Sequence, residues 1–463
     1  MNDPLAVTHV AHGRLVRGAD LEYTSRDRNV AFATPKLDID ALVWPRPAPG
    51  PAFDLPMAAV LDFLVATGKQ LAVDANPHLQ TALEATCLVN NMAPDVLRAS
   101  YDRLAPFFDR EILEFDLDHG LGQGTEWRTI VRPNGTTMAV RAYPLRLLHF
   151  LAGNGPPLSA FSIARGALTR GVNLLKLPSN DLFTAPAILA TMADLDPDHP
   201  VLRSFSAAYW RGGDEDVERR LFRREFFDTV VAWGGESALR NVQKYVGPGL
   251  DLVALNPKVS ISVIGREAFA DTETTEFVAQ CAALDVGAQE ACQDSRFQFV
   301  EGSVTEVDEF CGRLHARLVE STGPVPGRPT PPDVTQMLVR LQEQQADIRV
   351  WGDVDGRGLV IRSGEPLDIY PIGRTVNVVA TRDLADAARY VDVATQTVGI
   401  YPADRKAVLR EIVFAAGAQR VVTLGGVSTQ GMPHGRPHDG FYVLERMVRW
   451  VCDEELTKLP SGE

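Results

Sequence analysis

One cysteine, Cys292, stands in a stretch of glycine, alanine and glutamine ahead of a strand-like run that ends at Val300. This composition is typical of a turn. A thiolate is nucleophilic enough to take an acyl group from another thioester. The stretch therefore favours Cys292 as a nucleophile for acyl transfer. The alternative is that Cys292 is a small buried hydrophobic residue, as lone cysteines often are.

Five further motifs stand in one order along the chain. They are Ala152–Pro156 (AGNGP), Asn173–Asp181 (NLLKLPSND), Ala232–Glu236 (AWGGE), Asn256–Lys258 (NPK) and Pro437–Gly440 (PHDG). Together with Gln289–Cys292, they resemble the aldehyde dehydrogenase superfamily, most closely the LuxC-like fatty acyl-CoA reductases of bacterial luminescence. The resemblance extends from about Arg141 to the C-terminus. It implies an α/β fold that is aldehyde-dehydrogenase-like, with a Rossmann-type cofactor domain, an α/β catalytic domain, a helical N-terminal layer and an oligomerisation hairpin.

The resemblance implies a nicotinamide-cofactor site. The family's binding positions correspond to Lys176, Pro178, Ser179, Trp233, Gly234 and Gly235. Lys176 would hold the adenosine ribose or a 2′-phosphate, and the two glycines would let backbone amides at a helix start approach phosphate. No Gly-x-Gly-x-x-Gly follows a strand-like run, so the ordinary dinucleotide fingerprint is absent. The alternatives are a solvated cation at Lys176 and an ordinary tight turn at the glycines.

The residues after Lys176 favour NADPH as the cofactor. Relatives that prefer NAD usually carry a carboxylate there, whereas Ser179 and Asn180 are uncharged and Asp181 follows close behind. NADH is the alternative. No metal is expected, because the nine histidines form no HxH or HExxH cluster.

Three positions bear on the direction of reaction. By the resemblance, Asn154 and the backbone N–H of Cys292 would form an oxyanion hole, although Asn154-Gly155 would also make a turn. Ala254 stands where oxidative aldehyde dehydrogenases carry a water-activating glutamate. His438, beside Asp439, is suited to proton delivery, or belongs to a capped surface turn.

These positions together predict NADPH-dependent reduction of an acyl thioester to the aldehyde through acyl-Cys292. The substrate would be an acyl-CoA, fatty acyl for preference, or an acyl-carrier thioester. The resemblance implies a homo-oligomer, a dimer or tetramer, and makes an acyltransferase or synthetase a candidate partner. Two alternatives are an oxidative aldehyde dehydrogenase of the same fold and a non-catalytic subunit that binds acyl groups or acts as a scaffold.

Length and composition set the remaining limits. A chain of 463 residues predicts two or three domains. Its net charge of −14 argues against nucleic-acid binding. Five scattered cysteines, of which Cys87, Cys281, Cys311 and Cys452 are expected to be structural, favour a reducing compartment. With no apolar run near ~20 residues and no signal-like N-terminus, we expect a cytoplasmic protein without a membrane span.

The order of patterns predicts four segments. They are an N-terminal helical layer at 1–125, a cofactor-binding α/β domain at 126–265 with a hairpin at 127–141, a catalytic α/β domain at 266–440 and a C-terminal helix or tail at 441–463. Asn134-Gly135 marks the hairpin turn. Alternating strand and helix patterns, such as strands at 172–177 and 229–233 around a helix at 184–195, predict a parallel sheet.

Overall fold

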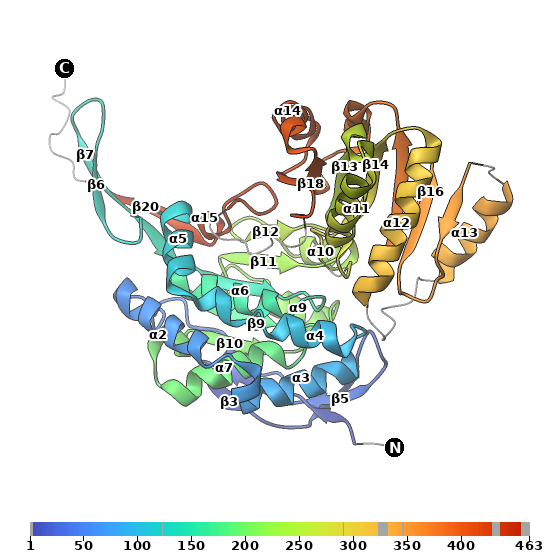
Figure 1. The fold of residues 1–463 in the computed structure, drawn as a ribbon. Helices are drawn as coiled ribbons and strands as arrows, with labels where there is room; N and C mark the ends of the chain where they lie inside the picture. The colour runs from blue at the N-terminus through green and yellow to red at the C-terminus, as the bar shows by residue number, and fades with distance from the viewer. Residues whose placement is uncertain are drawn as a thin grey trace. The chain divides into compact units, whose positions relative to one another are not determined.

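The chain divides into two compact units, coloured along the sequence in Figure 1. The computed structural model describes residues 3–122, 124–289, 291–322, 332–344, 347–427 and 436–454. Unit 1 comprises residues 1–255 and 433–463, and unit 2 comprises residues 256–432. Unit 2 is therefore an insertion in the chain of unit 1. Among the described residues, no helix is both long and apolar enough to cross a membrane.

Unit 1 is built on a sheet that has seven strands in the described part of the chain. In spatial order they are β12 (Asp251–Leu255), β11 (Thr229–Trp233), β8 (Arg146–Phe150), β9 (Val172–Lys176), β10 (Phe205–Ala208), β2 (His9–Ala11) and β3 (Arg14–Val16). The five strands from β12 to β10 are parallel, and β2 and β3 add antiparallel pairs at one side. The predicted parallel sheet is confirmed.

The helices between these strands show why the sheet is doubly wound. They are α6 (Pro157–Leu168), α7 (Thr184–Leu195), α9 (Glu215–Leu221) and α10 (Glu236–Gln243). The chain runs from β8 through α6 to β9 and through α7 to β10, then returns through α9 to β11 on the other side of β8. Right-handed crossovers place the two pairs of helices on opposite faces, so β8 and β11 flank the switch point at which such folds bind ligands.

The predicted helical layer covers part of the N-terminal segment. Its helices are α1 (Ile39–Leu42), α2 (Met57–Lys69), α3 (Pro77–Val89), α4 (Pro94–Tyr101) and α5 (Arg110–Gly120). Helix α3 begins where the Asn76 side chain accepts a hydrogen bond from the Leu79 amide, with Pro77 in the first turn. Five strands precede these helices. A small sheet is formed by β1 (Leu5–Ala6), β4 (Leu21–Thr24) and β5 (Ala31–Thr34), whereas β2 and β3 belong to the seven-stranded sheet. The sequence analysis did not predict these strands.

The predicted hairpin is present and gains a third strand. Strand β6 (Arg128–Val131) pairs antiparallel with β7 (Thr137–Pro144), and the turn contains Gly135 at a φ of 83°. Strand β20 (Val448–Asp453) pairs with the other edge of β7. The segment expected to be a C-terminal helix or tail thus contains the short α15 (Val443–Arg446) and a strand. The sheet extends away from the rest of unit 1 (Figure 1).

Unit 2 has its own sheet, which has seven strands in the part of the chain that the structure describes. In spatial order they are β15 (Arg349–Trp351), β16 (Leu359–Ser363), β17 (Thr375–Thr381), β14 (Ser295–Glu301), β13 (Val259–Ile264), β18 (Thr395–Tyr401) and β19 (Arg420–Thr423). All are parallel except β15. The flanking helices include α11 (Thr272–Val286), α12 (Val304–Thr322), α13 (Pro332–Gln344), the 3-10 segment η4 (Leu384–Tyr390) and α14 (Lys406–Ala416).

Two apolar layers hold the helices of unit 2 to the sheet. Helices α11 and α12 pack on one face through residues such as Val278 and Phe310, and η4 and α14 pack through Leu384 and Leu409. Helix α11 begins at Asp271, whose side chain accepts from the Thr274 amide, and ends before a glycine at positive φ. That ending releases the chain into the segment that carries Cys292.

Candidate active site

Three of the predicted motifs lie at one edge of the unit 1 sheet. Lys176 is the last residue of β9, Gly234 directly follows β11, and Asn154 lies four residues after the end of β8. The carboxyl ends of parallel strands meet at one edge, so the fold brings these segments to the edge where β8 and β11 form the switch point. The predicted cofactor positions and Asn154 therefore share one face of unit 1.

The Lys176 ammonium is surrounded by aromatic rings. Its Nζ lies 5.8 Å from the ring centre of Phe150, 5.4 Å from that of Tyr209 and 6.0 Å from that of Trp210. Burial lowers the pKa of Lys176 to about 8, while the carboxylate of Glu218 acts in the opposite direction. The buried Nε1 of Trp210 has no hydrogen-bond partner among the described residues. A cation and an orphaned donor of this kind fit an anionic, ribose-bearing ligand.

The loop after Lys176 is fixed by the turn between β4 and β5. Ser179 Oγ accepts from the Arg26 amide at 3.3 Å, and Asn180 Nδ2 donates to Asp27 Oδ2 at 2.8 Å. Pro178 is buried and Ser179 is half-buried. The Arg26 guanidinium, 65% exposed, brings a second positive charge close enough to help lower the pKa of Lys176. No sequence motif marks Arg26 as part of this site, because it lies about 150 positions before the loop that it contacts.

The Asn154 loop and the Lys176–Asp181 loop are joined by buried contacts. Asn90 Nδ2 donates to the carbonyl of Gly153 at 3.0 Å and to that of Asn180 at 2.9 Å. A Cβ on Gly153 would lie 1.7 Å from Asn180 Oδ1, so only glycine allows the two loops to pack this closely. The side chain of Asn154 itself is exposed. The predicted oxyanion residue is therefore carried on a loop whose position depends on the predicted cofactor loop.

The two glycines after β11 open helix α10. Gly235 is the N-cap residue, and its carbonyl accepts from the amides of Ala238 and Leu239. A Cβ on Gly235 would meet no atom within 4 Å, whereas one on Gly234 would lie 3.1 Å from Ala238 Cβ. Packing of the chain therefore does not require glycine at 235. The open space at a helix N-terminus fits the phosphate that the sequence analysis assigned to this place.

His438 and Trp233 lie together although they are far apart in the sequence. Their ring centres are 5.3 Å apart, and Phe161 of α6 lies 5.3 Å from Trp233 and 6.3 Å from His438. His438 Nε2 lies 3.7 Å from Asp439 Oδ1, in a turn closed by backbone hydrogen bonds between His438 and Phe441. The predicted surface turn thus exists, and it also turns the imidazole toward the aromatic rings.

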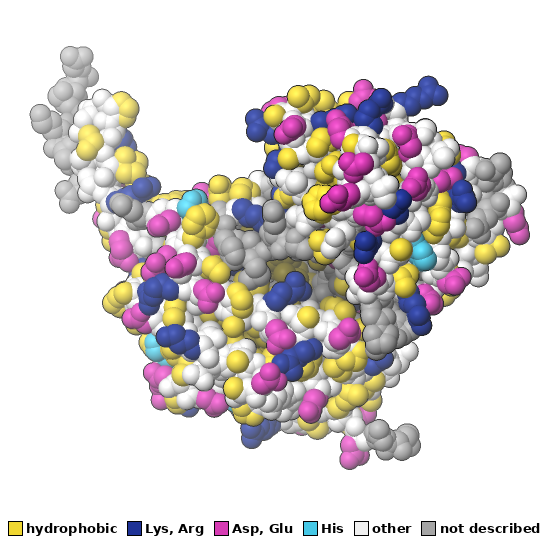
Figure 2. Space-filling model, in the orientation of Figure 1, with side chains coloured by type: hydrophobic (Ala, Val, Ile, Leu, Met, Phe, Trp, Pro, Cys, Tyr) yellow, Lys and Arg dark blue, Asp and Glu magenta, His cyan; other side chains and the backbone are white. Residues whose placement is uncertain are grey.

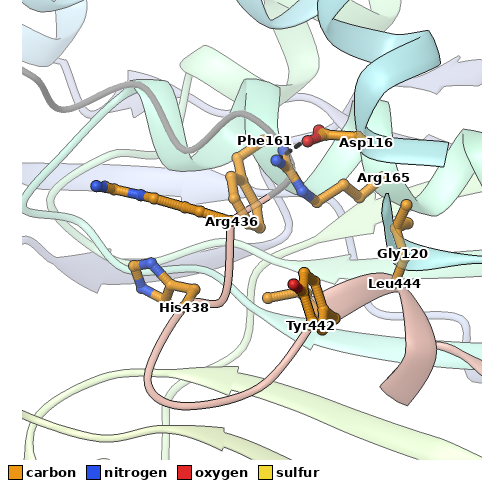
Figure 3. Close-up of a pocket in the computed structure, with 9 residues that line it drawn as sticks. Asp116, Gly120, Phe161, Arg165, Arg436, His438, Tyr442 and Leu444 are labelled. Carbon is orange, nitrogen blue, oxygen red and sulfur yellow. Dashed lines mark ion pairs between the residues drawn. The ribbon is translucent and has the colours of Figure 1, made fainter. Parts of the chain in front are cut away.

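Figure 3 shows the small cavity beside His438. Its lining comprises Asp116, Gly120, Phe161, Arg165, Arg436, His438, Tyr442, Val443 and Leu444. Its volume is about 20 Å³, room for about one water molecule. Asp116 and Arg165 form a buried ion pair at 2.6 Å, and the Arg165 guanidinium lies 3.6 Å from the ring centre of Phe161. The cavity as it stands is too small for an acyl chain.

Cys292 belongs to unit 2 and is half-buried. Ser260 Oγ donates to the Cys292 carbonyl at 2.9 Å, and Gln396 Nε2 donates to the sulfur at 3.2 Å. The segment that carries it is anchored by Gln289, whose buried side chain exchanges two hydrogen bonds with the backbone of Thr375. Glu290, two residues before Cys292, lies outside the described residues. Cys292 is therefore half-buried on a loop that these hydrogen bonds fix in place.

The other four cysteines differ from Cys292 in their surroundings. Burial raises the pKa values of the Cys87, Cys281 and Cys311 thiols, which disfavours their nucleophilic thiolate forms. Cys452 is exposed on β20. Among the described residues, no group of three or more His, Cys, Asp or Glu side chains could hold a metal ion.

Comparison with known proteins assigns the family. The family model described as acyl-CoA reductase (LuxC) matches residues 52–450. The chain belongs to this family. It is 26% identical over 411 residues to the long-chain acyl-protein thioester reductase of Vibrio harveyi, covering 87% of this chain and 83% of that protein. The protein of the same name from Photorhabdus luminescens is 30% identical over 321 residues, 68% of this chain and 65% of its own length.

Solved structures confirm the fold expected of a LuxC-family oxidoreductase. The NADP-dependent glyceraldehyde-3-phosphate dehydrogenase from Bacillus halodurans C-125 matches with a TM-score of 0.72 at 13% identity, covering 98% of this chain and 99% of that one. Aldehyde dehydrogenase 21 from Physcomitrella patens matches at 0.69 and 15%, with 99% and 100% covered. The predicted aldehyde-dehydrogenase-like α/β fold is therefore confirmed.

Proposed function

We propose that this LuxC-family chain reduces an acyl thioester to the aldehyde through an acyl-Cys292 intermediate, with NADPH as the reductant. The observation that carries the proposal is the half-buried Cys292 thiol, whose sulfur accepts a hydrogen bond from Gln396. The names of the relatives from Vibrio harveyi and Photorhabdus luminescens support an acyl thioester as the substrate class.

Each step assigns a task to the chain's own residues. The Cys292 sulfur attacks the thioester carbonyl, and the C–S bond to the departing thiol breaks as the acyl-Cys292 bond forms. The side-chain amide of Asn154 and the backbone N–H of Cys292 stabilise the oxyanion, and losing one such donor typically costs about 2.7–4 kcal/mol of barrier. A nicotinamide cofactor, when bound, would supply the hydride. His438 would deliver the proton that the departing thiolate of the first step takes up to leave as a thiol.

The preference for NADPH rests on charge at the adenosine end of unit 1. Lys176 and Arg26 bring two cations to the loop that carries Ser179. The nearest carboxylate in this turn, Asp27, pairs with Arg26 at 3.1 Å and accepts from Asn180 at 2.8 Å, so its repulsion of a phosphate is reduced. A 2′-phosphate is the group that these cations would distinguish from a ribose hydroxyl.

The proposed direction of reaction, reduction of the acyl group, rests on the residue at position 254, which pairs with Ala232 in the sheet. Ala254 is half-buried on β12, paired with Ala232 of β11, and offers no base that would activate water against an acyl-enzyme. The acyl group would then leave Cys292 by reduction. An oxidative aldehyde dehydrogenase of the same fold, or a non-catalytic acyl-binding subunit, is the alternative.

The sheet of β6, β7 and β20 supports the proposed homo-oligomer. Val131 is 68% exposed and Trp450 42% exposed, and Figure 2 shows hydrophobic side chains on the visible face of this sheet.

We further propose acyl-CoA or a carrier-bound acyl group as the donor and an acyltransferase or synthetase as a candidate partner. All five cysteines are free thiols, which supports the proposed cytoplasmic location.

The test compares two cysteine variants. Cys292→Ala should lose covalent labelling by radiolabelled acyl-CoA and thioester-dependent oxidation of NADPH, because no sulfur is left to carry the acyl group. Cys281→Ala, which removes a thiol of the same unit whose pKa is raised by burial, should keep both. Labelling or turnover retained in Cys292→Ala would reject the proposal. Free acid made from aldehyde and NADP without added thiol would favour the oxidative alternative instead.

A further inference from the structure

Strand β13, an inner strand of the unit 2 sheet between β14 and β18, is irregular beside Cys292. Strand β13 shifts register between Ser260 and Ile261 against β14, and between Val259 and Ile261 against β18. Bulges of this kind interrupt pairing and redirect side chains, and they are common next to active sites. Regular pairing of β13 with both of its neighbours, β14 and β18, is thus interrupted near Ser260.

Ser260 connects this irregularity to the cysteine. Its Oγ accepts from the Thr397 amide at 3.2 Å and donates to the Cys292 carbonyl at 2.9 Å. One hydroxyl therefore fills the gap left in the pairing with β18 and holds the backbone of Cys292. The start of β18 and the cysteine loop are fixed to each other through it.

Gln396 stands directly before Thr397, and its side chain reaches the sulfur. The residue is only 6% exposed, and its Nε2 donates to Cys292 Sγ at 3.2 Å. The Gln396 carbonyl accepts from the amide of Gln419, the residue directly before β19, at 3.2 Å, which fixes its backbone. A buried side-chain amide on fixed backbone is a preorganised donor, so little reorganisation is needed when charge develops on the sulfur.

We propose that Gln396 stabilises negative charge on the Cys292 sulfur at both ends of the catalytic cycle. In the resting enzyme its N–H favours the thiolate over the thiol. After reduction, the tetrahedral alkoxide on Cys292 re-forms its carbonyl, the C–S bond breaks, and the electron pair returns to the sulfur that Gln396 contacts. The inference rests on the proposed function, because it assigns Gln396 a role toward that nucleophile.

The charged groups of the neighbouring described segments have other contacts. Asp294 accepts from the Ala291 amide, and Lys258 donates its ammonium to the Val393 carbonyl at 2.6 Å. Asp285 accepts from Ser262 and from the Val427 amide. The sulfur itself accepts a hydrogen bond from the neutral amide of Gln396.

The test measures alkylation of Cys292 by iodoacetamide in the full-length protein without cofactor, with each cysteine read separately by mass spectrometry. Gln396→Leu should slow alkylation at pH 7 about tenfold and move its pH midpoint up by about one unit, because a hydrogen bond to a charged group is lost. Gln396→Glu should move the midpoint further, since a carboxylate repels the thiolate. Gln419→Leu, whose side chain instead donates to the Val393 carbonyl, should match the unmodified protein.

The outcomes separate this inference from the proposed function. An unchanged midpoint in Gln396→Leu, with acyl labelling still lost in Cys292→Ala, would overturn the role of Gln396 and leave the nucleophile in place. Equal shifts in Gln396→Leu and Gln419→Leu would indicate loosening of the sheet and would also overturn it. Acyl labelling retained in Cys292→Ala would reject the proposed function itself, whatever the alkylation profile of Gln396→Leu.

Discussion

Gly153→Ala should destabilise the protein, because Gly153 packs directly against Asn180 of the Lys176–Asp181 loop. The added Cβ would lie 1.7 Å from Asn180 Oδ1, about half of an ordinary contact distance of 3.4 Å. Asn180 is 2% exposed and donates to Asp27 at 2.8 Å, so its side chain has no free space to enter. Overpacking costs about 1–3 kcal/mol, and a lost hydrogen bond to a charged group costs about 1.5–3 kcal/mol. We expect the free energy of unfolding to fall by about 3 kcal/mol or more.

The same substitution should impair ligand binding, because the Lys176–Asp181 loop must move. Calorimetry with 2′,5′-ADP should show weaker binding to Gly153→Ala, and turnover should fall because Asn154 moves with its neighbour. Gly155→Ala is the matched control, since a Cβ there would meet its nearest atom at 3.7 Å. If the two variants unfold alike and bind 2′,5′-ADP alike, the coupling of the loops is refuted.

Two further predictions concern charge. Arg26→Ala should weaken binding of 2′,5′-ADP about tenfold and leave binding of AMP unchanged, because only 2′,5′-ADP carries the 2′-phosphate. The control is Arg28→Ala, which removes another arginine of the same turn, one that donates to the Cys87 carbonyl. Burial raises the pKa of Asp285 from 3.8 to about 7, so the folded chain holds a proton that the unfolded chain releases. The free energy of unfolding should therefore fall as pH rises from about 4 to 7, by up to about 4 kcal/mol, and Asp285→Asn should flatten that slope in urea titrations; an unchanged slope would contradict the assignment.

The elements that the sequence predicted best are those with strong local patterns. The helix expected at 184–195 and the strand expected at 229–233 have these bounds in the structure. Helix α6 was not predicted, because ten of its twelve residues are buried and no polar face marks a helical period. The strands of the first 34 residues are two to four residues long, and β2 forms its pairing with β10, about 200 positions away.

Residues of the candidate site could be predicted when they stand in a sequence motif. Residues that join the site only through a contact with a distant segment could not. Lys176, Asn154 and Cys292 were proposed as site residues because each stands in a motif. Asn90 and Gln396 were not predicted, since each hydrogen-bonds a distant segment. Asn90 donates to Gly153, 63 positions away, and Gln396 donates to Cys292, 104 positions away. A buried amide has no local pattern that distinguishes it from an ordinary polar residue, so the fold is needed to identify it.

The insertion of unit 2 into the chain of unit 1 has a consequence during synthesis. Strand β7 ends at Pro144 and its partner β20 begins at Val448, 304 positions later (448 minus 144). At about 5–20 residues per second, a ribosome needs about 15–60 s to make that interval. Throughout it, one edge of β7 on the nascent polypeptide has unpaired amides and carbonyls, next to a strand that carries the exposed Val131. That edge of β7 on the growing chain is therefore open to pairing with another nascent copy until β20 has been synthesised and pairs with it.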